Sequence, residues 1–95
     1  MVFDVSKVSG ISDYTKKAEK ERTLYCKDEK VFLVVNKNTI EVRCDKGLAK
    51  TLQEQYESVM ESRYFGRGGI EIVLTKQLSP EEVQDLVRLS YNLTI

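Results

Sequence analysis

The sequence contains no histidine, no tryptophan, one proline and two cysteines in 95 residues. Without histidine, neither a Ser-His pair nor a Cys-His pair can activate a nucleophile. Two cysteines that lie far apart in a chain without histidine do not form a zinc site. We therefore predict that the protein is not an enzyme and that it carries no metal and no cofactor.

An excess of one charge is also missing, because Lys plus Arg and Asp plus Glu each number 15. A balanced chain has no long-range field that would attract nucleic acid. No apolar run approaches the roughly 18 residues that cross a bilayer, and residues 1–5 lack the pattern of a secretory signal. We expect a cytoplasmic protein without a membrane partner.

Cys26 and Cys44 are expected to be reduced and half-buried in strands, with a disulfide between them as the alternative.

At this length the chain has room for one hydrophobic core, so we predict that residues 1–95 form a single domain. Near the start, Ser12 and Asp13 can cap a short helix that runs to about Glu21. That helix would expose its basic residues and support them with ion pairs between successive turns.

Three segments rich in β-formers follow, at residues 23–26, 31–35 and 39–44. The third segment alternates strictly between apolar and polar residues, which places Glu41 and Arg43 together on one face. This pattern is typical of an antiparallel meander that has one buried face and one solvent-facing side.

A helix over residues 46–60, capped by Asp45, and a strand at 70–74 come next, separated by a glycine-bearing loop. A last helix follows, so the order is (α)βββαβα. We predict an α+β fold in which an antiparallel sheet of about four strands has helices packed on one face.

The last helix has the strongest start signal in the chain. Ser79 and Glu82 have the spacing of a capping box, Pro80 occupies the first helical position, and Leu78 can pack on Val83. The predicted buried stripe then consists of Val83, Leu86, Val87 and Ser90. Tyr91 is expected in the core or at its rim, with its hydroxyl on water or a backbone acceptor.

Carboxylates are the remaining catalytic candidates. Glu71 on one strand can face Glu41 on another. Paired surface acids are usually only solvated, so we assign no catalytic residue.

Several short segments resemble one known family in their order and spacing. They are Val42-Arg43-Cys44-Asp45, Leu48-Ala49, Leu52, Glu54-Gln55-Tyr56, Leu78-Ser79-Pro80-Glu81-Glu82, Leu86-Val87 and Ser90-Tyr91-Asn92-Leu93-Thr94. On these segments, the chain from about residue 31 to its end resembles the MmcQ/YjbR-like family of small bacterial proteins. The glycine-bearing loop is more distantly similar to the N-terminal domain of TfoX-type competence regulators.

The chain departs from this family in the loop before the predicted strand at 70–74. Many members carry His-Met-Asn-Lys and a downstream Trp there, whereas this chain has Arg-Tyr-Phe-Gly-Arg-Gly-Gly at residues 63–69. The resemblance implies an α+β fold of the double-wing type and a role in DNA binding. It implies no family-wide enzymatic activity and no cofactor.

The segment 63–69 is the main candidate site. Its glycines, Gly68 among them, can aim consecutive backbone N–H groups at an anion, while Arg63 and Arg67 pair with phosphate. Tyr64 can stack on an exposed base. The alternative is that the glycines only permit tight turns before a strand, with the neighbouring phenylalanine in the core.

A second candidate comprises Lys37, in the turn at 36–38, and Arg43 on the solvent-facing side of the next strand. Such residues contact a phosphate backbone without reading base sequence, although a solvated hairpin tip is the alternative.

With the family resemblance, these residues favour weak, phosphate-directed binding of DNA or another nucleic acid. The rival hypothesis is a protein-interaction or regulatory module, in which the sheet face or an uncovered strand edge receives a peptide. A small-molecule sensor would need a pocket for which the chain leaves little volume.

Overall fold

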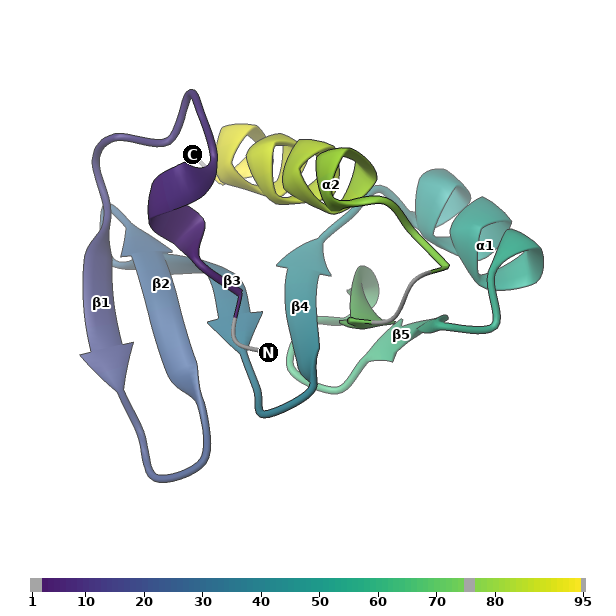
Figure 1. Ribbon diagram of the computed structural model, residues 1–95, viewed down its shortest axis with the longest axis horizontal. Coiled ribbons are helices and arrows are strands. Elements are labelled where there is room, and N and C mark those ends of the chain that lie inside the picture. The colour runs from purple at the N-terminus through teal and green to yellow at the C-terminus, as the bar shows by residue number, and fades with distance from the viewer. Residues whose placement is uncertain (1–2, 75–76, 95) are drawn as a thin grey trace.

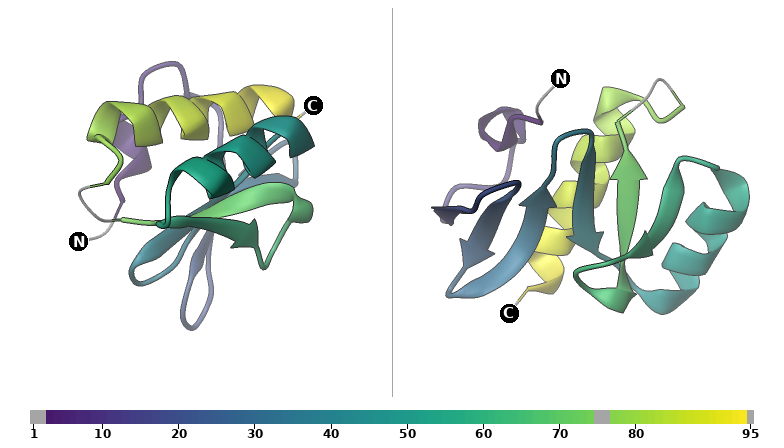
Figure 2. Two further views of the ribbon diagram at one scale, coloured as in Figure 1. Left: turned by 90° about the vertical axis from the view of Figure 1, so that its right-hand side faces the viewer. Right: turned by 90° about the horizontal axis from the view of Figure 1, so that it is seen from below.

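The computed structural model describes residues 3–74 and 77–94 and shows an α+β fold. The elements, in chain order, are the short 3-10 helix η1 (Val5–Lys7), β1 (Thr15–Ala18), β2 (Thr23–Lys27), β3 (Lys30–Val35), β4 (Thr39–Arg43), α1 (Lys46–Gln55), β5 (Val59–Ser62), β6 (Gly66–Val73) and α2 (Pro80–Leu93). Six strands form one antiparallel sheet in the order β1-β2-β3-β4-β6-β5. Both helices lie on one face of this sheet and leave the other face open (Figures 1 and 2).

The predicted fold class is confirmed, and so is the placement of both helices on one face of the sheet. The predicted strand number and element order are wrong, because the sheet gains β1 and β5. Among the described residues, no helix is long and apolar enough to cross a membrane.

The helix predicted near residues 12–21 is absent, and β1 occupies its middle. β1 pairs with β2 in an antiparallel register that sets Lys16 opposite Tyr25. Tyr14, the main apolar residue of this segment, stacks on Tyr25 with ring centroids 5.7 Å apart. Local helix propensity is a weak signal, and pairing with β2 overrides it here.

The second helix is shorter than predicted, because α1 ends at Gln55 and β5 begins at Val59. Val59 lies within the range predicted for this helix, but it is buried opposite Ile72 in the β5–β6 pair. Leu48 and Leu52 do pack α1 against the core. The eight-residue strand β6 would otherwise present unpaired N–H and C=O groups, and β5 satisfies them.

A β-bulge in β3 couples the sheet to α2. The register between β2 and β3 shifts so that Phe32 is an extra residue, which turns its side chain into the core. Its ring meets Tyr91 edge-on at 5.1 Å. Ser90 donates its Oγ hydrogen to the Phe32 carbonyl at 2.6 Å and accepts from the Arg43 amide at 2.8 Å. One buried hydroxyl therefore links α2 to both β3 and β4.

The start of α2 is as predicted. The Ser79 hydroxyl accepts from the Glu82 amide, and the Glu82 carboxylate accepts from the Ser79 amide, which completes the capping box. Leu78 and Val83 are both buried beside it. At the other end of the helix, the buried Tyr91 donates its hydroxyl to the Asp13 carbonyl at 3.2 Å, a backbone acceptor as expected.

The two cysteines are free thiols. Cys26 is half-buried in β2, as predicted, whereas Cys44 is fully buried and follows directly after β4. Burial raises the pKa of the Cys44 thiol, so this side chain stays protonated and acts as a small apolar group.

Candidate functional site

Two buried glutamates lie at the centre of the open sheet face. Glu41 on β4 and Glu71 on β6 are direct register partners, and they are only 2% and 3% exposed. The sequence predicted that Glu41 faces solvent, and this is wrong. Like charges opposite each other in a sheet repel, and a buried charge requires hydrogen-bonding partners.

Glu41 obtains these partners from two other parts of the chain. Its carboxylate accepts from Asn36 Nδ2 at 3.0 Å, from Ser62 Oγ at 2.8 Å and from the Tyr64 amide at 2.8 Å. Burial by itself would raise the pKa of Glu41. The three hydrogen bonds, together with the nearby charge of Arg63, outweigh burial and hold this pKa below its ordinary value.

Glu71 is neutralised from the solvent side by Arg63. The Arg63 guanidinium donates from Nε at 2.9 Å and from Nη2 at 2.8 Å, while Thr39 Oγ1 donates at 2.7 Å. The hydrogen bond to Glu71 raises the pKa of Arg63. All four oxygens of the glutamate pair therefore accept hydrogen bonds. This geometry anchors the segment 62–65 to the sheet and leaves no free carboxylate oxygen for proton transfer.

The glycines after this segment serve its close packing. A Cβ atom at Gly69 would lie 2.5 Å from the Val42 carbonyl oxygen and 2.7 Å from Phe65 Cβ, so only glycine fits beneath Phe65. Gly66 has a φ of +62°, which favours glycine in the turn. The Gly68 amide donates to the Phe65 carbonyl at 3.3 Å and is engaged inside the hairpin. Phe65 is half-buried here on the open sheet face.

Two arginines stack on the aromatic rings of this segment. Arg22, from the β1–β2 turn, has its Cζ 5.2 Å from the Tyr64 ring centroid, and Tyr64 is 39% exposed. Arg43 has its Cζ 4.9 Å from the Phe65 ring and donates from Nε to the Val31 carbonyl at 2.8 Å. Arg43 is thus half-buried and held in place, whereas Tyr64 remains accessible.

The open face is hollowed into a groove of about 1100 Å³. Its walls come from the β1–β2 turn, the β3–β4 turn and the segment 62–65, which are far apart in the sequence. Figures 1 and 2 show that the turns of the β1–β2 and β3–β4 hairpins project in the same direction, away from the helices. The lining residues are Glu19, Lys20, Glu21, Arg22, Asn36, Lys37, Glu41, Arg63 and Tyr64.

Of the site residues predicted from the sequence, the groove brings together Lys37, Arg63 and Tyr64. Arg67 lies in a separate, smaller groove of about 360 Å³ between α1 and the β5–β6 hairpin. The sequence analysis missed Lys20 and Arg22, because it assigned them to a helix. The two turn residues, Lys20 and Glu21, are not among the residues that mark hairpin turns, so the sequence carried no signal that would have placed them at a hairpin tip.

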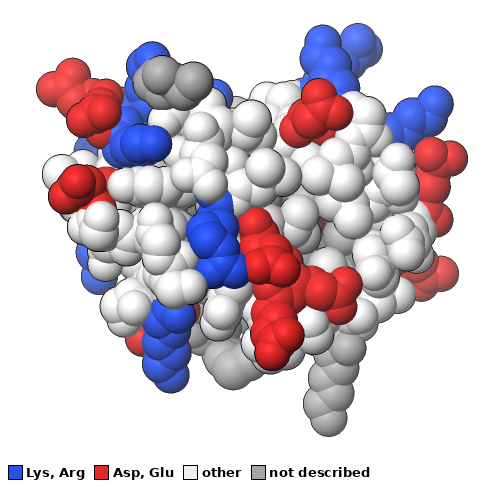
Figure 3. Space-filling view, turned by 90° about the horizontal axis from the view of Figure 1, so that it is seen from above, with Lys and Arg blue, Asp and Glu red and all other residues white. Residues whose placement is uncertain are grey.

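Among the described residues, the opposite, helix-covered side has no comparable basic surface. Figure 3 shows positive and negative groups in small, mixed clusters there, separated by uncharged area. Within residues 3–74 and 77–94, no group of three or more His, Cys, Asp or Glu side chains can hold a metal ion.

No family model, no curated protein and no solved structure matches the chain. The resemblance to the MmcQ/YjbR-like family therefore remains a prediction from the sequence.

Proposed function

We propose that this protein is a nucleic-acid-binding module that holds a single strand in the open-face groove, mainly by its phosphates. The observation that carries this proposal is the convergence of four cationic side chains and one exposed tyrosine on a single groove. These residues are Lys20, Arg22, Lys37, Arg63 and Tyr64. The groove also contains Glu19, which pairs with Arg22, Glu41, whose oxygens accept hydrogen bonds, and Glu21. The implied DNA-binding role of the family that the sequence resembles agrees with this choice.

Lys20 and Lys37 are the primary phosphate ligands. Both are exposed at hairpin tips, and neither pairs with a carboxylate in the part of the chain that the structure describes. Arg63 binds Glu71 through Nε and Nη2, yet its side chain is 75% exposed, which leaves Nη1 for a phosphate. Contacts of this kind fix the position of a nucleic acid and do not read its sequence.

Tyr64 favours a single strand over a duplex. Its exposed ring can stack only on a base that has left its own stack, and such stacking contributes about 1–3 kcal/mol per base. Arg22 already covers the ring from one side, so a base that enters would lie beside or displace that guanidinium. Bases inside a duplex are not accessible to the ring.

The formal net charge of zero limits the affinity. Counterion release gives single strands a slope of about −0.7 per phosphate contact in a plot of log K against log salt concentration. Three contacts, from Lys20, Lys37 and Arg63, therefore predict a slope of about −2. Binding should be measurable at low salt and weak near physiological salt.

An NMR titration of the labelled protein with a mixed-sequence single-stranded DNA, and with its duplex, tests this function. We expect amide shifts at residues 19–22, 36–38 and 62–65, larger for the single strand and reduced by salt. The Lys37→Ala/Tyr64→Ala variant should lose these shifts, whereas Lys7→Ala, which removes an exposed lysine on η1, should retain them. Unchanged binding by the double variant would rule out this groove as the site.

A further inference from the structure

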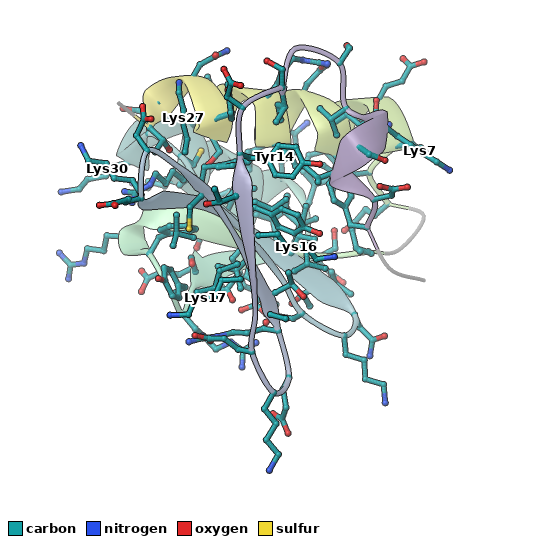
Figure 4. All side chains as sticks on the ribbon, turned by 90° about the vertical axis from the view of Figure 1, so that its left-hand side faces the viewer. Lys7, Tyr14, Lys16, Lys17, Lys27 and Lys30 are labelled. Carbon is teal, nitrogen blue, oxygen red and sulfur yellow. The ribbon has the colours of Figure 1, made fainter. Side chains whose placement is uncertain are left out.

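Besides the open face, the sheet has a second surface at which another chain could bind, the outer edge of β1. β1 is the terminal strand of the sheet, and all four of its residues are exposed. Figure 1 shows no helix or strand of the described residues beyond it, and Figure 4, viewed from that side, shows β1 in front of the rest of the molecule. An edge of this kind presents backbone groups that can pair with another chain.

The register of the β1–β2 hairpin identifies these backbone groups. The Glu19 amide donates to the Arg22 carbonyl at 2.8 Å, and the next pairs along the hairpin are Ala18 with Thr23 and Lys17 with Leu24. Hydrogen-bonded and non-hydrogen-bonded pairs alternate in an antiparallel ladder. The N–H and C=O groups of Ala18 and of Lys16, its counterpart two residues earlier, therefore point away from β2.

β1 itself carries only positive charge, on Lys16 and Lys17, and Asp4 lies within electrostatic reach of Lys16. Lys16 and Lys17 leave the strand on opposite sides, and Figure 4 also shows Lys7 on η1 and Lys27 and Lys30 beside the β2–β3 turn. Glu19, the acidic residue directly after β1, is paired with Arg22 at 2.7 Å. Lys27 is engaged with α2, because its Nζ donates to the Tyr91 carbonyl at 3.2 Å. Lys16 and Lys17 are the two cations on the edge itself.

These two lysines decide which partner fits. Two copies of β1 that pair antiparallel through the outward groups of Lys16 and Ala18 would place Lys17 of one copy directly opposite Lys17 of the other, and like charges directly opposite destabilise a strand pair. Lysines on an edge strand are a common protection against such self-pairing. The same charges complement a strand that carries carboxylates on both of its faces.

We infer that the outer edge of β1 binds an extended acidic segment of a partner protein by strand addition. The segment would exchange backbone hydrogen bonds with Lys16 and Ala18 and place adjacent acidic side chains opposite Lys16 and Lys17. Backbone bonds supply affinity in this mode of recognition, and side chains supply specificity. This surface is separate from the groove, so the inference does not depend on nucleic-acid binding.

A labelled synthetic peptide, acetyl-Thr-Val-Glu-Glu-Val-Thr-amide, is the probe, and its lysine counterpart, with Lys-Lys at the centre, is the specificity control. The full chain should bind the acidic peptide, with NMR shifts centred on residues 15–18, and should not bind the lysine peptide. Absence of binding by the acidic peptide at low salt would overturn the inference.

Three variants test the mode of binding. Ala18→Pro removes one outward N–H without changing charge, and proline is tolerated where an edge N–H faces solvent. Lys16→Glu/Lys17→Glu reverses the edge charge, while Lys50→Glu makes the same kind of change at an exposed position of α1. We expect roughly tenfold or greater loss of peptide affinity for the first two variants and less than about twofold change for the third.

Equal binding by the wild type and by Lys16→Glu/Lys17→Glu would overturn the inference, even if Ala18→Pro failed to fold. A concentration-dependent dimer that Ala18→Pro abolishes would replace the acidic partner with a second copy of the chain. Sedimentation of the free protein measures that outcome directly.

Discussion

Replacement of Glu41 by glutamine is the sharpest test of how the open face is built. The change keeps the size of the side chain and removes its charge. The glutamine oxygen can still accept from Ser62 and the Tyr64 amide, but its NH2 group only donates, so the Asn36 amide must turn its oxygen toward it, and all three hydrogen bonds lose their charge. A hydrogen bond to a charged group contributes about 1 kcal/mol more than a neutral one, so these bonds lose about 3 kcal/mol together.

Part of this loss is offset, because Glu71 no longer faces a like charge. A cross-strand pair of this kind contributes up to about 1 kcal/mol, which leaves a net destabilisation of about 2 kcal/mol. For a domain of this size, that change lowers Tm by about 10 °C. Thermal and urea unfolding followed by circular dichroism measure it, and Glu54→Gln on the exposed side of α1 is the matched control.

The pH dependence gives a second readout for Glu41→Gln. The folded-state pKa of Glu41 is depressed below the ordinary value of 4.5. The stability that this group contributes is therefore complete above that value and is lost as the pH falls through the folded-state pKa. The difference between wild type and Glu41→Gln should shrink on acidification. A variant as stable as wild type at neutral pH, or a difference that does not change with pH, would refute this reasoning.

Three other variants have outcomes that follow from single contacts. Ser90→Ala removes the hydroxyl that joins α2 to Phe32 and Arg43, and should cost about 1–3 kcal/mol in urea unfolding; no loss would mean that water replaces the hydroxyl. Gly69→Ala introduces a Cβ 2.5 Å from the Val42 carbonyl oxygen and should destabilise by about 1–3 kcal/mol, whereas Gly68→Ala, whose Cβ would lie 3.6 Å from the Phe65 carbonyl oxygen, should not. Ser79→Ala removes the cap of α2 and should cost about 1 kcal/mol, with Ser12→Ala as an exposed control.

The sequence predicted the elements whose signals are local. The capping box at Ser79 and the Asp45 cap, which accepts from the Gly47 and Leu48 amides, lie within a few residues of the helices that they start. The alternation at residues 39–44 identified β4 and its two faces. Each of these patterns is complete within one short segment, so no distant partner was needed.

The elements and contacts that were missed depend on distant partners. β1 forms because β2 offers it an edge, although its own residues are compatible with a helix. Glu41 is buried because Ser62 and Tyr64, some twenty positions later, fold over it. The groove likewise needs the β1–β2 turn beside Lys37 and Arg63. Strand alternation did allow one distant contact to be predicted, the approach of Glu41 to Glu71. The sequence did not show which groups would donate hydrogen bonds to these two carboxylates.

The salt dependence of single-strand binding tests the central claim most directly. The binding constant of a labelled single-stranded oligonucleotide is measured by anisotropy across a salt series, for wild type, Lys37→Ala/Tyr64→Ala and the Lys7→Ala control. We predict a slope of about −2 for wild type, a shallower slope with weaker binding for the double variant, and no change for the control. Absence of single-strand binding at low salt, or a double variant that binds with the wild-type slope, would contradict the account.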